Sequence, residues 1–151
     1  MSTFADTSFL CSLYVPLGHS ARAAAAMGKL RTPLSFSALL RYEFRQSIRL
    51  QIFRHQNDKT QGYPSVAGMK AMAALESDIV AGILRLEKVD FADVLDRAER
   101  LSSSATIPQG NRSMDILHVA TALHLKVGTF LSFDTCQRTL ATAAGLKIGP
   151  T

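Results

Sequence analysis

Short apolar segments alternate with longer helical patterns along the whole chain. The short segments predict strands at residues 2–6, 34–36, 86–89, 129–133 and 146–148. The segments between them predict helices over 7–15, 20–30, 38–56, 66–84, 92–102, 114–126 and 135–144. Because helices separate the strands, we expect a mostly parallel sheet with helices on both faces, which is an α/β fold.

The ends of several helices have recognisable signals. Ser37, Ser65 and Ser113 precede helical patterns and are expected N-caps. Gly145 follows the last helix and is the expected C-terminal glycine. Residues 102–109 are read as a loop.

Composition indicates one folded domain spanning residues 1–151. Hydrophobic residues make up 47% and charged residues 19% of the 151 residues, which excludes a disordered chain. No uncharged apolar stretch reaches the roughly 18 residues of a membrane span, and the N-terminus lacks the basic start of a secretory signal. We therefore expect a cytoplasmic protein, with Cys11 and Cys136 as buried, reduced thiols without metal-binding spacing.

The formal net charge is +5, from 17 Lys and Arg against 12 acids. A basic surface attracts polyanions without specifying which one. A solvated basic surface that has no partner accounts for the charge equally well.

Four acids have distinctive settings. Asp6 and Asp134 each stand where an apolar strand ends and a helix begins. Glu43 and Asp115 lie at or beside the apolar faces of predicted helices. Ligands of parallel sheets bind beyond the carboxyl ends of the strands, so we expect Asp6 and Asp134 at one edge of the molecule. Carboxylates placed there favour a cation among them, and oxygen ligands suit Mg²⁺ or Mn²⁺.

Each acid also has a simpler interpretation. Asp6 and Asp134 are good N-caps for the helices that follow them. Asp115 in a first helical turn favours the helix dipole, and Glu43 fits a solvated helix edge. These readings weaken when the four acids are taken together, because two strand-end acids and two helix acids are what a cation site on an α/β sheet needs.

Several polar residues are placed to support such a site. Ser8 and Ser132 are neighbours of the acids and candidates for orienting a carboxylate or a metal-bound water. Arg112 and Arg138 either bind a substrate phosphate or pair with a carboxylate. His118 follows Asp115 by one helical turn and is read either as a base or metal ligand or, preferably, as a packed or supporting histidine.

The ordered set of motifs resembles the PIN-domain nucleases, and within them the VapC-type toxins of toxin–antitoxin pairs. Asp6-Thr7-Ser8 is similar to the opening strand-end motif of that family, and Glu43 to its second acid. The run from Asp115 to Ala122 is similar to its most recognisable segment, and Ser132-Phe133-Asp134 to its late motif, although Thr is commoner at the position of Ser132. The resemblance covers nearly the whole chain.

The resemblance implies a three-layer α/β/α sandwich and an endoribonuclease that depends on one or two Mg²⁺ or Mn²⁺ ions. It also implies a homodimer that is inhibited by a small antitoxin protein. The residues carried over as catalytic and metal-binding are Asp6, Glu43, Asp115 and Asp134.

Two other classes of protein with strand-end aspartates fit the sequence less well. Aspartyl-phosphate enzymes need Asp-x-Asp near the N-terminus, but position 8 is Ser. Receiver domains need an early acidic doublet and a mid-chain phosphoacceptor, and the chain has neither. A catalytically degenerate PIN domain that only binds RNA or a protein remains the alternative.

Overall fold

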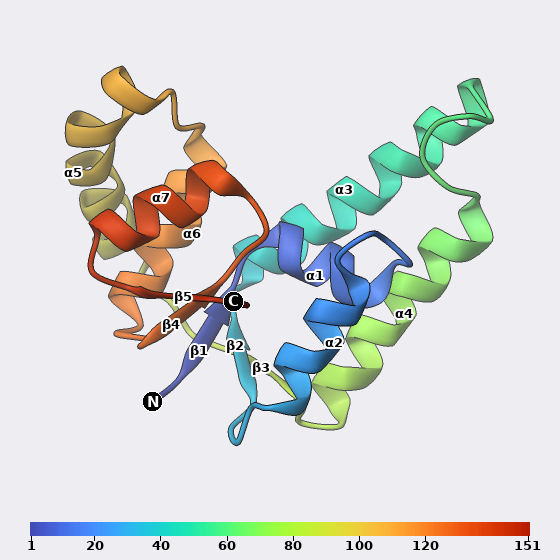
Figure 1. Ribbon diagram of the computed structural model, residues 1–151, viewed down its shortest axis with the longest axis horizontal. Helices are drawn as coiled ribbons and strands as arrows, with labels where there is room; N and C mark the ends of the chain where they lie inside the picture. Colours follow the sequence, from blue (N-terminus) through green and yellow to red (C-terminus); the bar gives the residue numbers. More distant parts are fainter.

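Five parallel strands form the central sheet of the computed structural model, which describes all 151 residues. The strand order is β3-β2-β1-β4-β5 (Figure 1). The strands are β1 (Thr3–Ala5), β2 (Leu34–Phe36), β3 (Leu84–Leu86), β4 (Thr129–Leu131) and β5 (Lys147–Gly149). The first strand therefore lies in the centre, where Phe4 is paired with Ser35 of β2 and Phe130 of β4.

Helices cover both faces of this sheet. They are α1 (Thr7–Tyr14), α2 (Ser20–Gly28), α3 (Ala38–Asn57), α4 (Ser65–Val80), α5 (Phe91–Gln109), α6 (Ser113–His124) and α7 (Thr135–Ala143). Figure 1 shows α1 to α4 on one side of the sheet and α5 to α7 on the other. The predicted three-layer α/β/α sandwich with a parallel sheet is confirmed.

The core is built on aromatic residues of the central strands. Phe4, Phe36 and Phe130 are completely buried, and the rings of Phe4 and Phe130 stack with centroids 6.2 Å apart. Helix α3 buries Leu40, Phe44 and Ile48, which recur every four residues and form its apolar stripe. This packing fixes the sheet edge that carries the site.

Several helix ends follow the sequence signals, and others do not. Ser37 caps α3 by accepting a hydrogen bond from the backbone N–H of Leu40, and Gly145 has a φ of +88° after α7. Ser65 and Ser113, however, are the first residues of α4 and α6, and neither helix has a side-chain N-cap hydrogen bond. Serine at a helix start fits the first turn as well as the cap, and the sequence alone does not separate the two.

Predicted boundaries were wrong in two regions of the chain. Helix α4 ends at Val80, because the chain turns at Gly82 with a φ of +74°, and the third strand begins at Leu84 instead of Leu86. Helix α5 continues through the segment 102–109 that was read as a loop, and it ends where Gly110 adopts a left-handed conformation.

Both cysteines lie in helices, as expected, but their burial differs. Cys11 is half-buried, whereas Cys136 is exposed on α7, so the expectation of two buried thiols was wrong for Cys136. No helix combines the length and apolar character needed to cross a membrane.

Candidate active site

The site is centred on two neighbouring strand ends. Asp6 directly follows β1, and Asp134 lies shortly after the adjacent strand β4. Ser132 joins them, because its hydroxyl donates to Oδ2 of Asp6 at 2.5 Å and accepts from the backbone N–H of Asp134 at 2.9 Å. The expectation that Asp6 and Asp134 share one edge of the sheet is met.

Asp6 is completely buried and fully engaged. Its Oδ1 accepts hydrogen bonds from the Ser8 hydroxyl at 2.7 Å and from the backbone N–H of Phe9 at 2.9 Å. Asp6 therefore does cap α1, as the simpler interpretation proposed. Burial nevertheless raises the pKa of Asp6 to about 6, against the lowering effect of these hydrogen bonds. A cation near this carboxylate would relieve that cost.

Arg112 supplies a positive charge between two other acids. Its Nε lies 3.0 Å from Oδ2 of the buried Asp115, and its Nη2 lies 4.0 Å from Oδ2 of Asp134. Hydrogen bonding to Asp115 raises the pKa of the Arg112 guanidinium. The Arg112 side chain is nonetheless 77% exposed, so it lies over the site and not within it. Asp134 also caps α7 through the backbone N–H of Gln137.

Glu43 contacts the segment that contains Asp6 and the segment that contains Asp115. The hydroxyl of Thr7, next to Asp6, donates to Oε2 of Glu43, and Nε2 of His118, one turn after Asp115, contacts the same oxygen. Burial acts to raise the pKa of Glu43, but its contacts with His118 and Thr7 outweigh burial and lower it.

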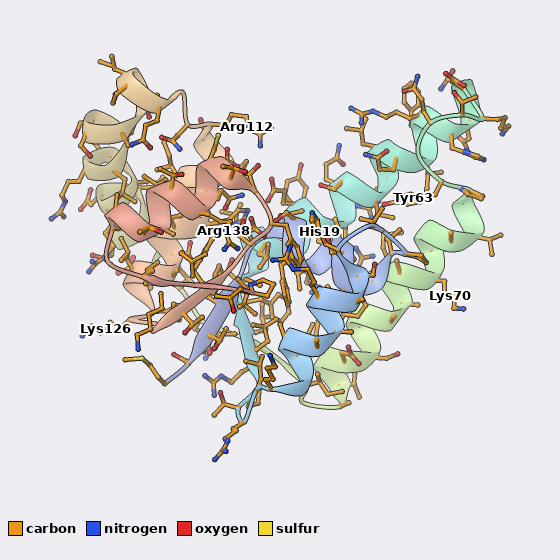
Figure 2. All side chains as sticks on the ribbon, in the orientation of Figure 1. His19, Tyr63, Lys70, Arg112, Lys126 and Arg138 are labelled. Atoms are coloured by element: carbon orange, nitrogen blue, oxygen red, sulfur yellow. The ribbon has the colours of Figure 1, made fainter.

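The four acids lie in one region, held partly by side-chain contacts and partly by neighbouring residues of the same segments. Ser132 links Asp6 to Asp134, Arg112 links Asp134 to Asp115, and Thr7 and His118 hold Glu43 against the segments of Asp6 and Asp115. Figure 2 shows Arg112 near the start of α6, on the α5–α7 side of the molecule. Residues far apart in the sequence thus converge at one end of the sheet.

Arg138 has a structural role. Its Nη1 donates to the carbonyl oxygen of Ser132 at 2.7 Å and to those of Gly149 and Pro150 at 3.3 Å. These bonds connect the ends of β4 and β5. This nitrogen is therefore engaged with backbone carbonyls, and Arg112 is the better placed of the two arginines for a substrate phosphate.

Thr7 was missed by sequence reasoning, and the partner of His118 was not foreseen. His118 is completely buried, its Nδ1 has no hydrogen-bond partner, and its other ring nitrogen contacts Glu43. This matches the reading of a packed, supporting histidine. The hydroxyl next to Asp6 was the available signal for Thr7, but its partner lies 36 residues away and only the fold reveals it.

The donor chemistry of the site fits a hard divalent cation. Four carboxylates and neighbouring hydroxyls are ligands that Mg²⁺ and Mn²⁺ prefer. No group of three Asp, Glu, His or Cys side chains is arranged so that it could hold a metal ion. Instead, the guanidinium of Arg112 is the positive charge between Asp115 and Asp134. A metal would therefore need Arg112, which is mostly exposed, to move aside.

Known structures identify the fold. No protein-family model matches the sequence, and no curated protein matches it significantly. Among solved structures, the chain is similar to VapC20 of Mycobacterium tuberculosis, a toxin that cleaves the sarcin-ricin loop, with a TM-score of 0.67, 20% identity and 96% of each chain covered. VapBC2 of Rickettsia felis, bound to a DNA fragment from its promoter, gives a TM-score of 0.67 at 14% identity, with 99% of this chain and 98% of that chain covered.

A third structure, VapBC-1 of nontypeable Haemophilus influenzae, gives a TM-score of 0.66 at 12% identity over 99% of this chain and 97% of that chain. The chain shares the fold of these toxin structures, which is the PIN-like fold expected from the sequence. At these identities the likeness establishes the architecture of the PIN domain alone. The chemistry of its site rests on the residues described above.

Proposed function

We propose that this PIN domain is a metal-dependent endoribonuclease, the toxin of a toxin–antitoxin pair. The observation that carries the proposal is the gathering of Asp6, Glu43, Asp115 and Asp134 at the carboxyl end of the sheet, where Ser132, Arg112, Thr7 and His118 hold them. The known activity of a similar fold, VapC20, supports RNA as the substrate class.

The residues have distinct roles in this proposal. Asp6, Asp115 and Asp134 would hold the metal, directly or through water, and Glu43 would complete the acidic cluster as a ligand or as the residue that orients the attacking water. Ser8 and Ser132 keep the Asp6 carboxylate in place. Arg112, released from Asp115, would bind a phosphate of the substrate, because a guanidinium pairs equally well with carboxylate and phosphate.

Mg²⁺ or Mn²⁺, as one or two ions, would supply a hydroxide nucleophile and neutralise charge on the phosphoryl oxygens. The chain would position the four carboxylates, and the side chains of Asp6 and His118 are completely buried. His118 fixes the direction of the Glu43 carboxylate through Nε2.

The deciding experiment is cleavage of total RNA by the purified protein, with Mn²⁺ and with EDTA. We expect cleavage with Mn²⁺, none with EDTA, and none in the Asp6→Asn or Asp115→Asn variants. Asp96→Asn is a matched control, because Asp96 is an exposed acid on α5. Cleavage that persists in both site variants would reject the assignment of the site.

The structural neighbours include VapBC complexes, which supports a cognate antitoxin as a partner. We propose that this chain forms a homodimer and is inhibited by such a small protein. Light scattering with size-exclusion chromatography tests the dimer, and co-expression with the product of a short neighbouring gene tests the antitoxin.

The alternative is a PIN domain that binds RNA without cutting it. The observation that favours it is the pairing of Arg112 with Asp115, since this guanidinium already balances two of the acids. Retained RNA binding with no cleavage in any divalent metal would favour this alternative.

A further inference from the structure

Three rings lie nearly parallel beside the site. Phe133 stands between Ser132 and Asp134, and its ring stacks on Phe9 with a centroid distance of 5.8 Å and an interplanar angle of 14°. The imidazole of His19 stacks on Phe133 at 4.4 Å and 5°. Phe9 is completely buried and His19 is exposed, so the stack extends from the core to the surface.

The exposed end of this stack is unengaged. His19 is the N-cap residue of α2, but its side chain makes no capping hydrogen bond. Asn, Asp, Ser or Thr would stabilise that helix start better, so the helix gives no reason for a histidine there. Figure 2 shows His19 near the middle of the molecule, beside α1. Its ring is therefore a flat surface held in place by Phe133 and available to a ligand.

A positively charged side chain, Arg22, lies beside the stacked rings. Arg22 lies three residues after His19, and its guanidinium carbon is 5.4 Å from the centre of the Phe133 ring. Arg22 is exposed, and its hydrogen bond to the carbonyl of Pro150 is long, at 3.4 Å. A stacking surface with a neighbouring positive charge matches a nucleotide, which has a flat base and an anionic phosphate.

We propose that His19, layered on Phe133, is a stacking platform for an unpaired base of the RNA, with Arg22 near the adjoining phosphate. The proposal rests on the proposed function and deepens it, because Phe133 directly precedes Asp134 and the base would flank the phosphodiester at the acidic site. Aromatic stacking accepts any base, so the platform would favour single-stranded or looped RNA over one particular sequence.

The test uses binding without cleavage. A short fluorescein-labelled single-stranded RNA is titrated with protein in the Asp115→Asn background and EDTA, with anisotropy as the signal. His19→Ala should weaken binding by roughly ten-fold, the size expected for the loss of one stacked base. His19→Phe should restore it, because the stacking face remains. Leu17→Ala is the matched control in the same loop, exposed but outside the stack.

A second measurement identifies the base contact itself. The chain has no tryptophan, so His19→Trp places a single tryptophan on the platform. Its emission should be quenched by the RNA but not by polyphosphate, which has charge without bases. The control variant Phe53→Trp, near the far end of α3, should not respond to the RNA.

The outcomes separate the two proposals. If His19→Ala binds as tightly as the parent, or if His19→Phe is as weak as His19→Ala, the platform is rejected while metal-dependent cleavage by the wild type still supports the nuclease. Equal quenching by polyphosphate also rejects it. A wild-type protein that neither binds nor cleaves RNA rejects the proposed function, and the platform with it.

Discussion

At the scale of single residues, the conflict between burial and charge defines the site. Asp6 is fully buried but has only hydroxyl and amide donors, so its carboxylate is costly to ionise. Glu43 is in the opposite position, because its contact with His118 favours the charged form. The pKa of Asp6 is therefore raised above its ordinary value, whereas the pKa of Glu43 is lowered below its own.

The raised pKa of Asp6 predicts a pH-dependent stability. The folded pKa, about 6, exceeds the ordinary value of 3.8, so this group stabilises the fold fully below about pH 4 and loses that contribution as the pH rises through 6. The change is on the order of 3 kcal/mol. In the absence of metal, the stability of the wild type should fall relative to Asp6→Asn as the pH rises, measured by urea unfolding. Parallel profiles for the two proteins would contradict the prediction.

Arg112 predicts competition with a metal. Removing its charge in Arg112→Gln should strengthen Mn²⁺ binding roughly five-fold, since the ion pair of Arg112 with Asp134 at 4.0 Å is worth about 1 kcal/mol in water and must be broken for the metal to bind. Isothermal titration calorimetry measures the change. The control variant Arg54→Gln removes an exposed arginine from a different helix, α3, and should leave the Mn²⁺ affinity as in the wild type. Equal affinities for all three proteins would show that Arg112 does not compete.

At the scale of elements, local signals predicted the α/β alternation but not every boundary. The segment 102–109 has serines and a proline, which suggest a loop. In the structure the hydroxyls of Ser103 and Ser104 donate to carbonyl oxygens of the preceding turn, and Ala105 is buried, so the helix continues. Tertiary packing decided this boundary, and packing against distant residues is not visible in a local sequence pattern.

The α3–α4 loop has a position that only glycine fits. Gly62 has a φ of +57°, and a Cβ there would lie 2.0 Å from the backbone oxygen of Gln51. Gly62→Ala should therefore cost at least about 1–2 kcal/mol, from the left-handed conformation alone. Gly18→Ala is the matched control, because a Cβ at Gly18 meets no atom within 4 Å. Urea unfolding compares the two, and equal stabilities would contradict the prediction.

At the scale of the whole molecule, the sheet order brings distant segments together. Placing β1 between β2 and β4 puts Asp6 next to Ser132, which is 126 residues away. The sequence was sufficient to predict that Asp6 and Asp134 share an edge, because both follow parallel strands. Ser132 was predicted to orient a carboxylate and Arg112 to pair with one as an alternative to phosphate, but which acids they contact, and the role of Thr7, depend on how distant segments pack.

Four acids gathered at one end of the sheet predict that a divalent cation stabilises the fold. At a concentration 100 times the dissociation constant, binding to the folded state alone adds about 2.7 kcal/mol, which for a chain of this size raises Tm by roughly 5–10 °C. Thermal unfolding with and without Mn²⁺ measures this rise. An Asp115→Asn, Asp134→Asn double variant should show no rise, and an unchanged Tm in the wild type would contradict a metal site here.

The unequal exposure of the two cysteines has a practical consequence. Burial raises the pKa of the Cys11 thiol to about 12, which suppresses its reactivity, whereas Cys136 is exposed two positions after Asp134. A maleimide dye or spin label would therefore attach at one defined point, on the helix that Asp134 caps. Wild-type protein can thus report in real time when a substrate or inhibitor arrives, without any engineered attachment point.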